Sequence, residues 1–162
     1  MTDETLDGAS VPATPLKLLI QYLKDLSFEN PGAPHVHIHR GDLPRAELSL
    51  DVRARTIAPM QYEVSLVLGI TAQREQETVY IAELEYAGLF DVTGIPEEHV
   101  TPLLMIEAPR MLFPFAREVL AKATRDGGYP PVMVNPIDFH AVFREQLRRR
   151  QQENGTAPVA NA

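Results

Sequence analysis

Two neighbouring runs decide the fold, YEVSLVLGITAQ at residues 62–73 and TVYIAELEYAGLFDV at residues 78–92. In both runs apolar side chains occupy every second position, which is the period of a β-strand. A third run, residues 47–56, alternates in the same way. Because the connections between these runs are too short for a helical crossover, the runs predict an antiparallel meander.

The run at residues 78–92 is apolar on both of its predicted faces. One face carries Tyr80, Ala82, Leu84, Tyr86 and Phe90, and the other carries Val79, Ile81, Glu83, Glu85, Ala87 and Leu89. Helices of the same chain can cover one face of such a sheet. The other face would then stay partly apolar, which predicts self-association.

The segment Leu16–Glu29 fits two structures. Leu16, Leu19, Leu23 and Leu26 have the spacing of a helix, whereas alternate residues also suit one face of a strand. The period of the apolar residues does not decide between them.

The second half of the chain is typical of helices. Pro96 begins a helix near Glu97, and Pro109 and Pro114 are predicted to interrupt or restart it. The pair Gly127-Gly128 ends this helical region, and Asp138 can cap a last helix. Strands followed by helices predict an α+β fold, with helices packed on one face of the sheet.

Length and composition fit one domain, since the chain has 162 residues and a 44% hydrophobic share. We expect a folded domain at residues 16–152, a flexible acidic N-terminal tail at 1–15 and a flexible C-terminal tail at 153–162. The net charge is −7, of which residues 1–90 carry −6 (7 basic and 13 acidic side chains). This balance argues against nucleic-acid binding, and an acidic sheet face would suit a basic partner.

Membrane insertion and secretion find no support in the sequence. No uncharged run approaches the roughly 20 residues that a membrane-spanning helix needs. The N-terminus is acidic where a secretory signal is basic, so we expect a cytoplasmic protein. There are no cysteines, and no glycine-rich phosphate loop is present.

One spacing could hold a metal ion, namely His35, His37 and His39. On a strand the three imidazoles would share a face and could bind Zn²⁺ with one open position. The segment between Pro34 and Gly41 could equally be an irregular loop with three exposed histidines. A small metalloenzyme that uses these histidines is therefore one alternative function. A second alternative is an adaptor domain for a folded partner.

Four separated segments occur in the same order in a known family. They are KDLSFENPGAP (24–34), AELEYAGLF (82–90), LFPFARE (112–118) and GGYPPVMVNPIDFHAVF (127–143). With them the chain resembles SecB, the bacterial protein-export chaperone family, from about Leu16 to Gln151. The resemblance implies that Leu16–Glu29 is the first of four antiparallel strands. It also implies a homotetramer, built as a dimer of dimers.

The resemblance further implies an activity that is not enzymatic. SecB-like proteins hold newly made precursor proteins unfolded in the cytosol and deliver them to the ATPase SecA, without a nucleotide, metal or other cofactor of their own. Carried over by motif, the residues that bind the basic, zinc-bearing C-terminal tail of SecA are Asp25, Glu29, Ile81 and Glu83. The positions that match those holding the dimers together are Ala82, Leu84 and Tyr86. Candidates for the client-binding groove are Leu43, Met111, Phe115, Phe139 and Phe143.

Overall fold

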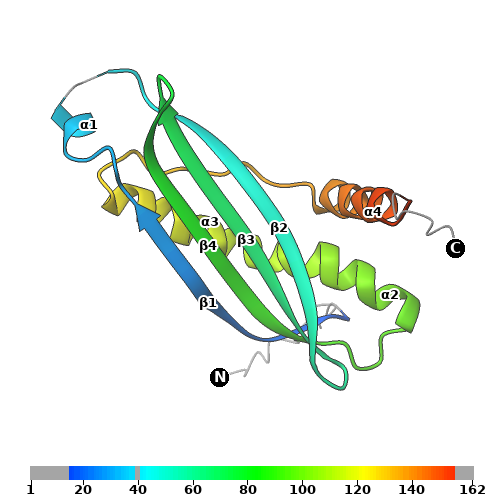
Figure 1. Ribbon diagram of the computed structural model, residues 1–162. Coiled ribbons are helices and arrows are strands. Elements are labelled where there is room, and N and C mark those ends of the chain that lie inside the picture. The colour runs from blue at the N-terminus through cyan, green and yellow to red at the C-terminus, as the bar shows by residue number, and fades with distance from the viewer. Residues whose placement is uncertain (1–14, 39–40, 156–162) are drawn as a thin grey trace, which may run out of the picture.

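The computed structural model describes residues 15–38 and 41–155. Four strands form one antiparallel sheet in the order β1-β4-β3-β2 (Figure 1). The strands are β1 (Lys17–Glu29), β2 (Arg45–Ala58), β3 (Gln61–Arg74) and β4 (Glu77–Asp91). The helical elements are α1 (His35–Ile38), α2 (Glu97–Pro102), the π-helical turn η1 (Leu103–Glu107), α3 (Ala108–Asp126) and α4 (Phe139–Gly155). The predicted α+β fold and the meander of β2, β3 and β4 are confirmed.

Strand β1 pairs with β4, so the helical alternative for Leu16–Glu29 is wrong. The pairing contains two register shifts, between Leu18 and Ile20 and between Leu23 and Asp25. Each shift inserts one extra residue, which is the property of a β-bulge. Two bulges break the period of two, and for this reason the apolar residues of β1 also matched the spacing of a helix.

The hydrophobic core lies between one face of the sheet and helix α3, which crosses that face in Figure 1. We call this sheet face the inner face. The side chains that fill the core are fully buried on both elements; they include Leu66, Leu68 and Phe90 from the sheet and Leu112 and Leu120 from α3. Burial of this kind is the main favourable contribution to the stability of the fold.

Helix α3 runs from Ala108 to Asp126 without a break, so the predicted interruption at Pro114 is wrong. A proline inside a helix removes one backbone hydrogen bond and its ring crowds the carbonyl four residues earlier. Here Leu112 and Phe113 on one side of Pro114, and Ala116 on the other, are buried against the core. We infer that this packing outweighs the loss of the hydrogen bond.

Helix α4 begins as the sequence predicts. The backbone N–H of Ala141 donates to Asp138 Oδ1 at 3.1 Å, which caps the first turn. The helix continues to Gly155, three residues past the domain boundary that we expected at residue 152. Among the helices in the described part of the chain, none is long and apolar enough to cross a membrane.

Strands β1 and β2 are the opposite edges of the sheet, and the described residues that follow β1, up to 38, lie at the end of the sheet (Figure 1). This segment is held to the end of α3 by Asn30, whose Nδ2 donates to the carbonyl oxygen of Gly127 at 3.0 Å. The Tyr129 hydroxyl donates to Asn30 Oδ1, and the Tyr129 ring lies between those of Tyr80 and His37, with centroids 4.5 and 5.0 Å away. This end of the sheet is thus a packed aromatic cluster.

Candidate functional site

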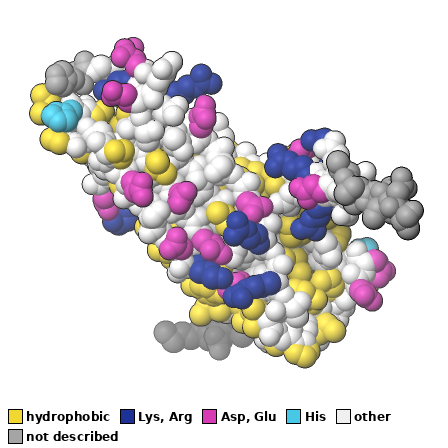
Figure 2. Space-filling model, viewed as in Figure 1, with side chains coloured by type: hydrophobic (Ala, Val, Ile, Leu, Met, Phe, Trp, Pro, Cys, Tyr) yellow, Lys and Arg dark blue, Asp and Glu magenta, His cyan; other side chains and the backbone are white. Residues whose placement is uncertain are grey.

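The face of the sheet that α3 leaves uncovered, here the outer face, carries the acidic side chains of β1 and β4. In the register of the two strands, Asp25 is opposite Glu85 and Glu29 is opposite Ile81. Glu83 lies between these two positions on β4. The four residues expected to bind SecA, namely Asp25, Glu29, Ile81 and Glu83, therefore lie together on one face. Figure 2 looks onto this side and shows acidic side chains along the sheet with basic ones nearby.

A shallow hollow of about 200 Å³ lies among these carboxylates. Asp25, Glu83 and Glu85 line it, together with Gly69 of the neighbouring strand β3. Gly69 is opposite Glu83 in the register, and a Cβ atom at this position would lie 2.4 Å from Ser49 Oγ. The missing side chain at Gly69 therefore contributes to the hollow and leaves the flanking carboxylates accessible.

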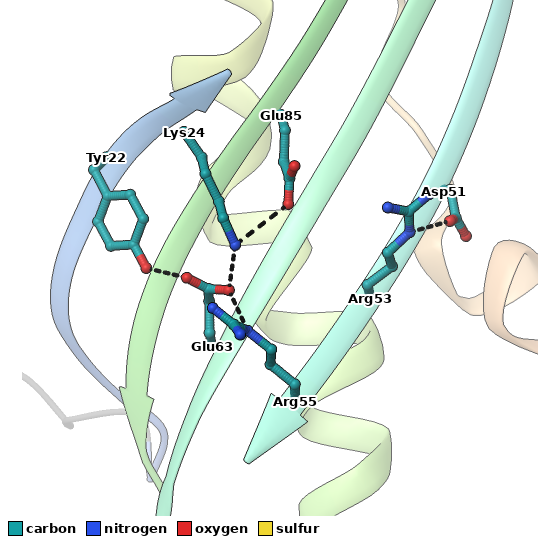
Figure 3. A network of polar contacts seen from close by, with 7 residues as sticks. All are labelled: Tyr22, Lys24, Asp51, Arg53, Arg55, Glu63 and Glu85. Atoms are coloured by element: carbon teal, nitrogen blue, oxygen red, sulfur yellow. Dashed lines mark hydrogen bonds and ion pairs between the residues drawn. The ribbon is translucent and has the colours of Figure 1, made fainter. Parts of the chain in front are cut away.

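Next to the hollow, a buried carboxylate binds three side chains from two other strands (Figure 3). Glu63 of β3, whose side chain is 6% exposed, accepts hydrogen bonds from Lys24 Nζ at 2.7 Å and Arg55 Nε at 2.7 Å. It also accepts one from the Tyr22 hydroxyl. Lys24 Nζ lies 3.7 Å from Glu85 Oε1 as well. We call these five residues the Glu63 network.

The network shifts the ionisation of its two central groups. The hydrogen bond from Arg55, followed by those from Lys24 and Tyr22, lowers the pKa of Glu63 to about 2 despite its burial. Burial, followed by the hydrogen bond to Glu63, raises the pKa of Tyr22 to about 12. At neutral pH Glu63 is therefore ionised and Tyr22 is a neutral donor, which is the protonation state that the geometry requires.

Glu63 should make the stability of the protein sensitive to acid. Its folded-state pKa of about 2 lies below the ordinary value of 4.5, so its contribution is complete above pH 4.5 and is lost as the pH falls towards 2. At about 1.4 kcal/mol per pKa unit, the upper limit of this contribution is about 3 kcal/mol, because solvent screens the partly exposed Lys24 and Arg55 side chains. We expect Glu63→Gln to unfold more easily than the wild type in urea at pH 7, and this difference to shrink between pH 4.5 and pH 2. A difference that is independent of pH would contradict the assignment.

The three positions expected to hold dimers together lie on the inner face. Ala82, Leu84 and Tyr86 of β4 are all buried beneath the helical layer. The Tyr86 ring is stacked on that of Phe115 in α3, with centroids 6.3 Å apart. Phe115 itself is 48% exposed. Of the three positions, Tyr86 is therefore in contact with a ring that is exposed at the surface of this chain.

The five candidates for the client-binding groove do not form one groove in this structure. Leu43 is exposed in the segment that precedes β2, whereas Met111 and Phe115 lie on α3. Phe139 is fully buried against Phe113, with ring centroids 6.1 Å apart, and so offers no surface to a client. Phe143 lies elsewhere, on α4.

Phe143 lines a pocket of about 240 Å³ between α4, the α2–η1 region and strands β2 and β3. Its other apolar lining residues are Ala54, Tyr62, Val100, Leu104, Met105 and Leu147. Sequence reasoning did not find these residues. The four-residue spacing of Phe143 and Leu147 on one helix could have indicated part of the set.

The histidine cluster is not arranged along a strand. His35 and His37 lie in the short helix α1, and the His37 ring packs against Tyr129. His39 lies outside the described residues. Within residues 15–38 and 41–155, no group of three or more His, Asp or Glu side chains is placed to hold a metal ion.

Comparison with known proteins identifies the family. The family model "Preprotein translocase subunit SecB" matches residues 10–150. The protein-export protein SecB of Maricaulis maris is 49% identical over 96% of this chain and 94% of its own length. That of Granulibacter bethesdensis is 43% identical over 100% of this chain and 97% of its own length. The chain therefore belongs to the SecB family, and it is a protein-export chaperone rather than an enzyme.

A solved structure agrees with the fold. It is a SecB-like chaperone of Mycobacterium tuberculosis in complex with a ChAD peptide from the HigA1 antitoxin. It matches with a TM-score of 0.64 and 19% sequence identity, covering 75% of this chain and 90% of that chain. At this level of identity the match concerns the fold, and the family assignment rests on the sequence relatives.

Proposed function

We propose that this protein holds precursor proteins unfolded in the cytosol without ATP and delivers them to SecA through the outer face of the sheet. The acidic surface around Ile81 is the main support. Asp25, Glu29 and Glu83 are exposed there, and none of them forms an ion pair within the described part of the chain. Unpaired carboxylates on an exposed face suit a basic partner, because complementary charge speeds association and favours the right partner.

Clients would bind at the apolar pocket next to Phe143 and at exposed apolar side chains such as Leu43. Side chains of Leu, Met and Phe impose few directional hydrogen bonds, so such surfaces accept many sequences. A folded client buries its own apolar segments and would not compete for these sites. The preference for unfolded chains then follows from the exposure of their apolar segments and does not require recognition of a particular sequence motif.

We propose that the chains assemble into a tetramer and that the exposed apolar surface of β1 takes part in the contacts between them. This strand pairs with β4 along one edge, and its other edge is unpaired among the residues that the structure describes. Edge strands of this kind are ready templates for pairing with another chain. Leu18, Leu23 and Leu26 of β1 project from the inner face and are more than a third exposed, as is Phe115. A dimer of dimers would cover both the edge and this apolar surface, and several client sites in one particle would raise the effective concentration of each.

The activity is tested by refolding a denatured, slowly folding protein in the presence of this chaperone and without nucleotide. We expect refolding to be blocked at near-stoichiometric amounts, while the native form of the same client is not bound. Refolding at an unchanged rate would contradict the proposal. It would favour the alternative of an adaptor for a folded partner.

A further inference from the structure

Lys24 and Asp25 are neighbours in the sequence, and both lie over the outer face of the sheet. The register shift between Leu23 and Asp25 places Lys24 in a β-bulge, so the two successive side chains do not alternate between faces. Asp25 lines the hollow with Glu83. A lysine next to a docking carboxylate would normally be free to pair with it and reduce its charge.

The ammonium group of Lys24 is instead held by Glu63, as Figure 3 shows. Its Nζ lies 2.7 Å from Glu63 Oε1 and 3.7 Å from Glu85 Oε1. Glu63 is almost fully buried, and an ion pair at a buried carboxylate is screened less by solvent than one at the surface. The same carboxylate also holds Arg55, at 2.7 Å. One buried acid thus retains two cations, of which Lys24 adjoins the acidic surface.

We infer that Glu63 is a positioning residue for partner docking, which keeps Lys24 away from Asp25 and Glu83. The inference rests on the proposed function, because it concerns the surface proposed to bind SecA. Without Glu63, the anionic groups left to Lys24 are Glu85, at 3.7 Å, and the other carboxylates that line the hollow, Asp25 and Glu83. If Lys24 paired with these carboxylates, its ammonium group would neutralise negative charge that binds the basic partner. Binding would then weaken although no docking residue has been replaced.

The test compares Glu63→Gln with the double variant Glu63→Gln/Lys24→Gln, using a synthetic peptide of the C-terminal tail of SecA loaded with zinc. Gln has the shape of Glu but no charge, so it releases the cations with little change in packing. We expect Glu63→Gln to bind the peptide about fivefold more weakly, the upper range for one surface ion pair. The double variant should recover most of the affinity, because the released ammonium is gone.

A matched control is Glu145→Gln on helix α4. Glu145 also holds two cations, Arg148 at 2.6 Å and Arg149 at 3.0 Å, but it lies away from the outer face. This variant makes the same change in net charge and should bind the peptide as the wild type does. Native mass and thermal unfolding at pH 7 verify that each variant is folded and assembled.

A crystal structure of Glu63→Gln gives a readout that does not depend on SecA. We expect Lys24 Nζ within 4 Å of the Asp25 or Glu83 carboxylate, without Glu63 as a partner. If the wild type does not bind the peptide, the proposed docking function fails, while the structure of the variant still decides whether Glu63 retains Lys24. Lys24 found away from both carboxylates overturns the inference.

Two affinity results would also overturn it. One is a Glu63→Gln variant that binds the peptide as well as the wild type. The other is a double variant that stays as weak as Glu63→Gln, since a purely structural role would not be rescued by removing Lys24. If Glu63→Gln does not fold, Lys24→Met is compared with the wild type. A severalfold gain in affinity would then show that Lys24 already neutralises the surface, and would overturn the inference.

Discussion

Replacing Glu83 with Lys is expected to weaken binding of SecA's C-terminal tail about 30-fold while leaving the capture of unfolded clients unchanged. Glu83 lies at the centre of the acidic surface, opposite Ser27 of β1 and Gly69 of β3. A lysine there removes one negative charge and adds a positive one that can pair with Asp25. Disrupting a charged contact at an interface costs about 2 kcal/mol or more, which corresponds to roughly 30-fold in affinity.

The measurement is titration calorimetry with the tail peptide, at low and at physiological salt, beside the refolding assay. The control is Glu97→Lys, which makes the same change of charge in the first turn of α2 and should bind the peptide normally. Equal affinity of the Glu83→Lys variant and the wild type would remove this face as the SecA site. Loss of client capture in the same variant would mean that the two functions share a surface.

Replacing Phe115 with Asp is expected to convert the proposed tetramer into smaller species, with dimers as the main product. Phe115 is half exposed on α3, and its ring covers Tyr86. In an assembled interface its side chain would be buried, and a carboxylate at this position would lose its hydration without gaining a partner. Tyr86→Asp would be a less clean test, because Tyr86 is already buried within one chain and its replacement would also destabilise the fold.

Native mass spectrometry and sedimentation measure this effect directly. Leu43→Asp is the matched control: it makes the same apolar-to-acidic change at a position that is 75% exposed, in the segment before β2. We expect this control to keep the mass of the wild type. An unchanged mass for Phe115→Asp would place the contact between dimers elsewhere on the molecule.

The sheet and its two faces were predictable from the sequence, because β2, β3 and β4 alternate with few irregularities. Strand β1 was not predictable from periodicity alone, since its two bulges add residues that only the pairing with β4 explains. Pro114 misled the prediction of α3, because the local effect of proline was outweighed by burial of Leu112 and Ala116. In both cases contacts distant in the sequence determined the local structure.

The candidate site was predictable in part. The alternation of β4 placed Ile81 and Glu83 on one face, but their role as a docking surface came from the resemblance to SecB. The Glu63 network was missed, because Tyr22 lies 41 residues from Glu63 in the chain. One part of it could have been found: the tight turn between β2 and β3 brings Arg55 directly opposite Glu63. Cross-strand pairs of opposite charge at such positions are common stabilising contacts.

The position of β1 in the sheet also affects how this protein is made. Lys17 pairs with Asp91 and Glu29 with Ile81, so the paired residues are 74 and 52 positions apart. On a ribosome that adds roughly 5–20 residues per second, β1 is complete several seconds before β4 exists. During that interval its leucines have no partner strand. A newly made chain of this chaperone therefore exposes the kind of apolar segment that the finished protein is proposed to bind.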